Sequence, residues 1–225
     1  MARVLVSGRI HPSGMAVLTA EPGLEIYLVP DPGAILPMDR LTRADALLIR
    51  YGTLSDEQVA AMPRLRVVSR HGVGCDNLPV QSLAARGVPV TIVGPVNAVS
   101  VAEQVLTMLL ALIKRLGAYD AAVRGGHWAI RDSLAVGELS GRRLLLLGFG
   151  RIGREVARRA RAFDMAVGVH DPFVTAETIT AAGCEPVADW RAALAEYDAL
   201  SLHLPATPET LGMIGTAELA AMNPT

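Results

Sequence analysis

Short runs of aliphatic residues alternate along the chain with longer stretches in which apolar residues recur every three or four positions. The short runs predict strands, in the first part of the chain at Val4–Ser7, Leu24–Val29, Ala46–Arg50, Arg66–Arg70 and Val88–Ile92. The periodic stretches between them predict helices at Pro12–Ala20, Asp56–Met62 and Pro79–Arg86. Strands that alternate with helices through short connections indicate a parallel sheet with helices on both faces, so the predicted fold class is α/β.

The second part repeats this alternation after a long and almost entirely apolar helix. We expect that helix to begin at Asn97 or Ser100 and to end near Gly117. Four consecutive leucines, Leu144–Leu147, then predict a strand buried on both faces. The remaining expected elements are helix Arg151–Phe163, strand Met165–His170, helix Trp190–Ala195, strand Ala199–Leu204 and a last helix from about Thr216. This β-α-β-α-β series indicates one mononucleotide-binding half of a Rossmann domain.

Composition narrows the class of protein. Of 225 residues, 51% are hydrophobic and 4% aromatic, which is typical of an α/β protein with an aliphatic core. A net charge of −1 offers no basic surface for nucleic acid or for an anionic membrane, and no apolar run is long enough to span a bilayer. Cys75 and Cys184 lie far apart and lack metal-ligand spacing, so we expect reduced thiols, no metal and a cytoplasmic location.

The strongest chemical signal is the glycine pattern that follows the four leucines. Gly148 permits a tight turn, Gly150 lets the backbone approach a pyrophosphate, and Gly153 allows helix and strand to pack closely. The N–H groups of Arg151 and Ile152, at the start of the helix, would then face phosphate oxygens. The pattern therefore predicts a dinucleotide site, with a purely structural glycine turn as the alternative.

Asp171 stands at the end of the next strand, roughly 20 residues past the glycines. A carboxylate at this position accepts hydrogen bonds from the adenosine ribose and repels the 2′-phosphate of NADP. The cofactor favoured by the sequence is therefore NAD. The alternative interpretation is a loop aspartate that shapes the turn at Pro172.

Four motifs of the chain occur in the order found in one enzyme family. They are Arg70-His71-Gly72-Val73-Gly74-Cys75-Asp76-Asn77, Ser100-Val101-Ala102-Glu103-Gln104, the glycine pattern of residues 148–153, and His203-Leu204-Pro205-Ala206-Thr207-Pro208-Glu209-Thr210. With these motifs the chain resembles, over essentially its whole length, the D-isomer-specific 2-hydroxyacid dehydrogenases, and within them the phosphoglycerate-dehydrogenase-like branch. The resemblance implies an NAD-dependent enzyme that interconverts a D-2-hydroxy acid and its 2-keto acid by hydride transfer.

The same resemblance implies a domain organisation and a partner. Residues 1–98 would form a flavodoxin-like substrate domain, and residues 99–225 a Rossmann NAD-binding domain. The partner would be a second copy of the chain, in a homodimer to which the helix from Ser100 contributes.

Substrate-binding roles also follow from the resemblance. The backbone amides of Gly72, Val73 and Gly74 would hold the substrate carboxylate, as successive N–H groups in a glycine loop are able to do, and Val73 would also lie near the nicotinamide. The alternative for this loop is a plain strand-to-helix turn. Arg50 matches a position that reaches the substrate, with a solvated surface arginine as its alternative.

The motif after the last strand completes the predicted cofactor site. Leu204 and Pro205 would line the pocket along the cofactor. His203 lies in the same segment, and the resemblance gives it a structural role there rather than an acid–base one.

Reduction of a 2-keto acid also needs a cation that polarises the carbonyl and a proton donor. The family supplies these through an Arg and a Glu-paired His without counterparts among the 225 residues, and only His71, beside the carboxylate loop, remains as a candidate. We therefore expect a C-terminally truncated chain that carries only the first half of the Rossmann domain, with Leu144–Leu147 as an exposed apolar edge. The alternative functions are an NAD-sensing, corepressor-like binding protein and a formate-dehydrogenase-like enzyme. Nothing in the sequence indicates which hydroxy acid is used.

Overall fold

The computed structural model describes residues 1–31 and 36–223 and shows two compact units, Met1–Pro95 and Val96–Thr225. The chain thus divides between Pro95 and Val96, whereas the sequence placed the domain boundary after residue 98. Both units contain a parallel sheet with helices packed on it, which confirms the predicted α/β fold class. No helix among the described residues is long and apolar enough to cross a membrane.

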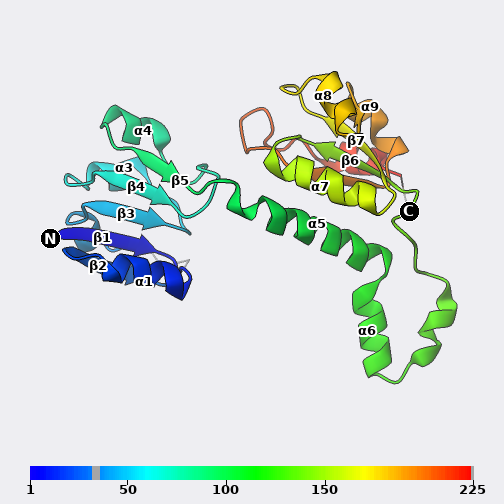
Figure 1. Ribbon diagram of the computed structural model, residues 1–225, viewed down its shortest axis with the longest axis horizontal. Coiled ribbons are helices and arrows are strands. Elements are labelled where there is room, and N and C mark those ends of the chain that lie inside the picture. Colours follow the sequence, from blue (N-terminus) through cyan, green and yellow to red (C-terminus); the bar gives the residue numbers. More distant parts are fainter. Residues whose placement is uncertain (32–35, 224–225) are drawn as a thin grey trace. The chain divides into compact units, whose positions relative to one another are not determined.

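The first unit is built on a five-stranded parallel sheet (Figure 1). Its strands are β1 (Ala2–Ser7), β2 (Leu24–Val29), β3 (Ala46–Ile49), β4 (Val67–Arg70) and β5 (Val90–Ile92). Their order in the sheet is β2-β1-β3-β4-β5, which is the flavodoxin-like order that the resemblance implied. The connections reverse direction between β1 and β3, so this pair of strands forms the switch point of the sheet.

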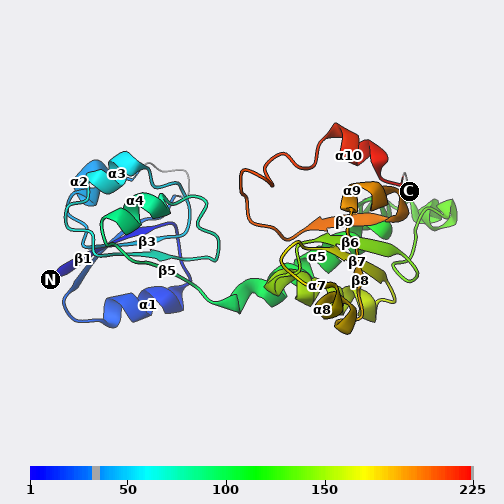
Figure 2. The same ribbon diagram turned by 90° about the horizontal axis from the view of Figure 1, so that it is seen from above.

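Helices cover both faces of this sheet (Figure 2). Helix α1 (Pro12–Ala20) lies on one face, and the other carries α2 (Met38–Leu41), α3 (Asp56–Ala60) and α4 (Val80–Ala85). The Ser55 hydroxyl caps α3 by accepting a hydrogen bond from the amide of Gln58. The Gln58 side chain in turn accepts the amide of Ser55, which completes a capping box. Helix α2 was missed in the sequence because four residues are too few to show a period.

The second unit contains a four-stranded parallel sheet in the order β8-β7-β6-β9. Its strands are β6 (Arg143–Leu147), β7 (Ala166–His170), β8 (Glu185–Pro186) and β9 (Ala199–Leu202). Leu144 and Leu146 belong to the core cluster on one face, and Leu145 and Leu147 to the cluster with Trp190 on the other. Successive side chains of a strand point to opposite faces, so this run of leucines fills two cores at once.

The prediction that Leu144–Leu147 forms an exposed edge is wrong. All four leucines are fully buried, and β6 pairs with β7 on one side and with β9 on the other. The error arose at β8, which has only two residues and no apolar run, and was therefore missed. The segment Ala199–Leu204 was then counted as the third strand, whereas β9 crosses over to the far side of β6 as the fourth.

The helices of the second unit pack on both faces of its sheet (Figure 2). Helix α5 (Ala98–Ile113) lies against α7 (Arg151–Ala162). The expected continuation of α5 to Gly117 is wrong, because Arg115 adopts a left-handed φ of 49° and starts the separate helix α6 (Leu116–Arg124). The unit also contains α8 (Ala176–Ala181), α9 (Trp190–Ala193) and α10 (Thr216–Ala221).

Candidate functional site

Strand β6 leads directly into the predicted glycine turn. Gly148 has a φ of +99°, and a Cβ built there would lie 2.5 Å from the carbonyl oxygen of His203. A Cβ on Gly153 would collide with the carbonyl oxygen of Gly148, so α7 packs against the turn only because Gly153 has no side chain. Around Gly150 no described heavy atom lies within 4 Å of a built Cβ. The three glycines therefore stand where a tight turn, an open approach and a close helix contact require them.

The N-terminus of α7 presents backbone amides without acceptors. Gly150 is the N-cap, no side chain caps it, and the first turn contains no acidic residue. The first amide bonded within the turn is that of Arg154, which donates to the Gly150 carbonyl at 3.1 Å. Within the part of the chain that the structure describes, the amides of Arg151 and Ile152 have no acceptor, and the helix dipole adds positive charge at this end. This geometry suits a phosphate anion.

The Asp171 carboxylate lies against the same turn. Its Oδ2 accepts the amide of Phe149 at 2.7 Å, and its Oδ1 accepts the amide of Phe173 at 2.9 Å. The bond from the Phe173 amide shapes the turn at Pro172, which was the alternative interpretation of Asp171. The bond from the Phe149 amide joins the carboxylate to the glycine turn. Each carboxylate oxygen keeps a further lone pair, so both roles leave Asp171 able to accept from a ribose hydroxyl.

The segment after β9 reaches the turn from the other side. The His203 amide donates to the carbonyl of Leu147 at 2.7 Å, and its Nε2 lies 3.0 Å from the Ser201 hydroxyl oxygen. Burial lowers the pKa of His203, which favours its neutral form. Leu204 touches the Gly148 position, and the exposed Pro205 follows it. The structure thus gathers the residues predicted to bind the cofactor within the second unit at one turn.

In the first unit the loop after β4 carries the predicted carboxylate site. The Gly72 carbonyl accepts the amide of Val93 at 3.1 Å, and the Gly74 carbonyl accepts a side-chain hydrogen bond at 3.0 Å. In a planar trans peptide the N–H points opposite to the C=O, so the amides of Val73 and Cys75 point away from these partners. Among the described residues neither amide has an acceptor, nor does the amide of Gly74. The Gly72 amide, which was predicted to hold the carboxylate, donates to the Arg70 carbonyl at 2.8 Å instead and is not free. Three successive N–H groups without acceptors are the arrangement expected of an anion-binding nest.

Arg50 lies at the end of β3, beside the switch point of the first sheet. Its Nη1 donates to the Arg9 carbonyl at 2.5 Å, and its guanidinium carbon lies 4.7 Å from the centre of the Tyr51 ring. A hollow of about 450 Å³ opens there, lined by Arg9, Pro30, Asp31, Arg50 and Tyr51. The Arg50 side chain is thus held in place and borders a hollow.

Arg70 contacts the carboxylate loop but received no role from the sequence. Its Nε is the donor to the Gly74 carbonyl, and its guanidinium lies against Gly72. The signal that points to it is an arginine at the end of a strand, immediately before a glycine loop.

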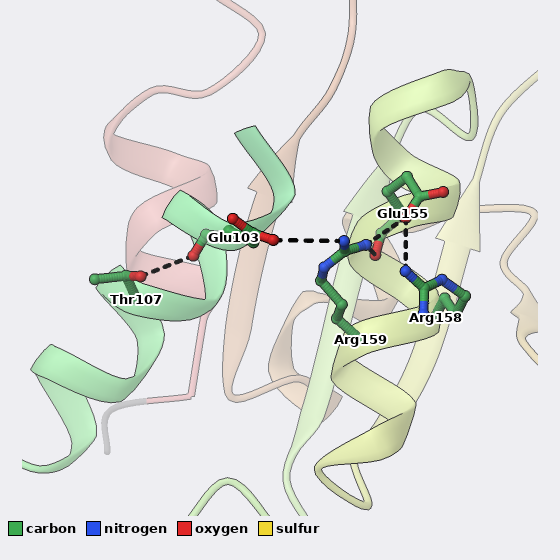
Figure 3. Close-up of polar contacts among 5 residues, drawn as sticks. All are labelled: Glu103, Thr107, Glu155, Arg158 and Arg159. Carbon is green, nitrogen blue, oxygen red and sulfur yellow. Dashed lines mark hydrogen bonds and ion pairs between the residues drawn. The ribbon is translucent and has the colours of Figure 1, made fainter. Parts of the chain in front are cut away.

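An ion-pair cluster joins α7 to α5 (Figure 3). Arg159 pairs with Glu155 on its own helix and with Glu103 of α5 at 3.8 Å, while the Glu103 carbonyl accepts the Thr107 hydroxyl at 2.8 Å. Hydrogen bonds from Arg159 and Arg158 lower the pKa of Glu155. Glu103 belongs to one of the four sequence motifs, and its position shows that this motif lies where α5 packs against the helix of the glycine turn.

Both cysteines are free thiols, and burial raises the pKa of Cys184. Among the described residues no group of three or more His, Cys, Asp or Glu side chains is suited to hold a metal ion.

Comparison with known proteins identifies the family. Residues 106–225, more than half of the chain, match the family model described as D-isomer specific 2-hydroxyacid dehydrogenase, NAD binding domain. D-3-phosphoglycerate dehydrogenases of Mycobacterium tuberculosis and Methanocaldococcus jannaschii are 38% and 30% identical to the chain over 222 and 223 residues. These alignments cover 98% and 99% of this chain but 41% and 42% of the relatives, so the chain spans about two fifths of their length.

A solved structure with the same fold is D-lactate dehydrogenase from Aquifex aeolicus, complexed with NAD and lactic acid. The TM-score is 0.83 and the identity 28%, with 97% of this chain and 66% of that chain covered. The family model and these relatives confirm the resemblance drawn from the four motifs. The chain belongs to the D-isomer specific 2-hydroxyacid dehydrogenase family, and residues 106–225 are its NAD-binding domain.

Proposed function

We propose that the protein acts in the NAD-dependent interconversion of a D-2-hydroxy acid and its 2-keto acid. One observation carries the proposal: a member of this family has two groups of backbone amides without acceptors among the described residues, one in each unit. The first group is at the N-terminus of α7, with Asp171 beside it, and the second is in the loop after β4. In the reduction, NADH supplies a hydride to the keto carbon and a proton completes the new hydroxyl group.

The residues of this chain bind and orient the reactants in this scheme. Amides at the start of α7 bind the pyrophosphate, Asp171 binds the adenosine ribose, and the amides of residues 73–75 hold the carboxylate. The open space in front of Gly150 lets the pyrophosphate approach the backbone. We assign carbonyl polarisation and proton donation to none of these residues, because the resemblance gives those roles to positions without a counterpart here.

Cofactor choice tests the proposal. We expect NADH to bind more tightly than NADPH by about 1–3 kcal/mol, since the 2′-phosphate meets the Asp171 carboxylate, and Asp171→Ala to narrow that gap. Fluorescence titration with both cofactors measures it, with Asp120→Asn on the distant helix α6 as the matched control. Turnover is assayed separately, as NADH oxidation with a panel of 2-keto acids, in a full-length protein that carries this chain together with the family's catalytic Arg, Glu and His. Equal affinity for the two cofactors, or no keto-acid-dependent oxidation of NADH by that full-length protein, contradicts the proposal; cofactor binding without turnover in it favours the NAD-sensing alternative.

For the substrate we propose a 2-hydroxy acid that carries a second anionic group. The relatives from Mycobacterium and Methanocaldococcus are named D-3-phosphoglycerate dehydrogenases. In this chain the guanidiniums of Arg9 and Arg50 border the hollow at the carboxyl ends of β1 and β3, where Asp31 offsets one of the two charges. In the full-length protein that carries the family's catalytic residues, we expect Arg50→Gln to raise the KM of phosphohydroxypyruvate and to leave that of unphosphorylated hydroxypyruvate unchanged. A parallel rise in both KM values contradicts this assignment.

We also propose that the protein is a cytoplasmic homodimer in which α5 contributes to the interface. Leu112 on α5 is 75% exposed, and it borders a hollow of about 560 Å³ that also includes Leu109 and Leu134. A large exposed apolar surface of this kind marks an interaction site. We expect Leu112→Asp to convert a dimer to monomers in light scattering, while Val17→Asp, at an equally exposed position on α1, has no effect. A monomeric unmodified protein contradicts the dimer.

A further inference from the structure

The guanidinium of Arg70 is the centre around which the loop after β4 is folded. Its Nη1 lies within hydrogen-bond distance of three backbone carbonyls, those of Arg50 at 2.7 Å, His71 at 3.2 Å and Ile49 at 3.3 Å. Its Nε donates to a fourth carbonyl, on Gly74, at 3.0 Å. One planar group thus joins the end of β3, the end of β4 and the far side of the loop.

These bonds bear directly on the direction of the loop amides. Because the Gly74 carbonyl is turned toward Arg70, the N–H of the same peptide plane, on Cys75, is turned away from it. A Cβ built on Gly72 would lie 3.0 Å from Cζ of Arg70, so the loop runs in contact with the guanidinium. Two carbonyls of the loop, those of His71 and Gly74, thus face the Arg70 side chain, and the Gly72 amide donates to the Arg70 carbonyl at 2.8 Å. The amides of Val73, Gly74 and Cys75 are left without acceptors among the described residues.

The charge of Arg70 is not neutralised locally. Among the described residues no ion pair joins its side chain to a carboxylate, and the four partners above are neutral carbonyls. A buried or half-buried arginine whose role is structural is usually paired with an acid. Here the positive charge lies against the loop that carries the three free amides, and it adds to the attraction of this loop for an anion.

We infer that Arg70 is a positioning residue of the carboxylate site: its fork of N–H groups folds residues 71–74 so that the amides of Val73, Gly74 and Cys75 face one anion. The inference rests on the proposed function, because it concerns the same carboxylate site. A lysine does not replace it, since a single ammonium group has no planar fork with which to reach Gly74 and the ends of both strands.

The test is a titration of the 15N-labelled protein with oxalate, a non-reacting carboxylate, followed through the amide signals. In the unmodified protein we expect the signals of Val73, Gly74 and Cys75 to shift. In Arg70→Gln and in Arg70→Lys we expect the oxalate affinity to fall by about tenfold or more and these shifts to shrink. Arg66→Gln, at the other end of β4 and with an exposed side chain, serves as the matched control and keeps the affinity.

Two further measurements separate positioning from general stability and from the proposed function. NADH affinity and the thermal unfolding of the second unit should be unchanged in Arg70→Lys, since the carbonyls that Arg70 bonds in the described part of the chain all belong to the first unit. The inference is overturned if Arg70→Lys binds oxalate as tightly as the unmodified protein, which would reduce the role to charge. It is also overturned if the three amides of the unmodified protein do not respond to oxalate. Failure of the unmodified protein to bind NADH contradicts the proposed function instead, and the oxalate titration can still be interpreted by itself.

Discussion

At their switch points the two units turn the chain in nearly the same way. Gly8 follows β1 with a φ of +88° and donates its amide to the Val29 carbonyl at 2.8 Å. Gly148 follows β6 with a φ of +99° and donates its amide to the His170 carbonyl at 2.9 Å. In both units the first strand of the sheet thus ends in a left-handed glycine that is bonded to the end of the next strand.

The strand across the switch point also begins alike in both units. Asp45, just before β3, accepts the amide of Arg3 at 2.8 Å, and Asp198, just before β9, accepts the amide of Arg143 at 2.7 Å. Each carboxylate fixes the start of its strand against the central one. The framework that opens a crevice at the carboxyl ends is therefore common to both sheets.

The difference lies in how the next helix begins. Helix α1 has a proline at its first position and is capped by His11, whose side chain accepts the Ser13 amide at 3.3 Å. Helix α7 starts at Gly150 with neither a cap nor an acid in its first turn. Of these two helices, α7 therefore offers free amides to a phosphate and α1 does not, and in the described part of the first unit three successive free amides lie instead in the loop after β4. A common framework thus presents different sets of free amides through a few residues at the ends of its strands, and we propose that these sets bind different ligands.

The largest expected effect comes from adding a side chain at Gly153, where α7 packs against the glycine turn of the second unit. Gly153→Ala places a Cβ against the backbone carbonyl of Gly148, which cannot move aside without shifting the turn. We expect a loss of about 1–3 kcal/mol in the free energy of unfolding and a loss of NADH binding. In the matched variant Gly14→Ala of α1, the nearest atom is the flexible Cδ1 of Ile10 at 3.4 Å. That change should raise stability by about 0.5–1 kcal/mol, and urea unfolding that finds the two variants equal would contradict the comparison.

Gly150→Val separates binding from folding. Nothing described lies within 4 Å of a Cβ at Gly150, and its φ of −75° is open to any residue. We therefore expect stability to stay within about 0.5 kcal/mol of the unmodified protein, while NADH affinity falls by about tenfold or more as the side chain occupies the approach to the helix amides. Gly94→Val, also in open space but in the first unit, should change neither quantity. NADH titration and urea unfolding of the same samples decide the outcome.

A smaller effect is expected from the pH dependence of stability at His203. Burial depresses the pKa of this imidazole, so the unfolded chain binds its proton more tightly than the folded one. The contribution of His203 is therefore full above its unfolded pKa of about 6.5 and is lost as the pH falls below that value. His203→Gln should lose less stability than the unmodified protein between pH 7.5 and pH 5.5 in urea unfolding. The exposed His127→Gln should behave like the unmodified protein, and an unchanged pH slope in His203→Gln would refute the assignment.

The smallest effect is expected at the ion pair between α5 and α7. Glu103 is largely exposed, so Glu103→Gln should cost about 0.5 kcal/mol of unfolding free energy, and less at high salt. Glu138→Gln, an exposed carboxylate of the same unit, is the control. A loss above about 2 kcal/mol would show that the pair contributes more than a surface salt bridge does.

The sequence predicted the elements with strong periods and missed those set by single residues. Helix α1 and strand β2 have the predicted bounds, and α7 differs by one residue at its end. Strand β8 was not predicted because Glu185 and Pro186 carry no apolar pattern. Without β8 in the count, β6 was predicted to be an edge strand, whereas it is a central one. The break between α5 and α6 escaped because Arg115 carries none of the glycine or proline signals that mark a left-handed residue.

The cofactor motif could be predicted because Gly148 and Gly153 stand where the backbone tolerates no side chain, so the residue type itself indicates the turn and the close helix contact. The bonds from Asp171 to Phe149 and Phe173 follow from that same turn. Arg70 could not be assigned in the same way, because its role depends on carbonyls of β3 that lie some 20 residues away along the chain and are brought near only by the sheet.

The central claim is that two similar switch points differ in their ligand, and a titration of the 15N-labelled protein with NADH tests it most directly. We predict that NADH shifts the amide signals of Gly150, Arg151, Ile152 and Asp171 in the second unit. The signals of Gly8 and its neighbours, at the switch point of the first unit, should stay unshifted because α1 offers no free amides there. Shifts centred on Gly8 with residues 150–152 unaffected would contradict the account.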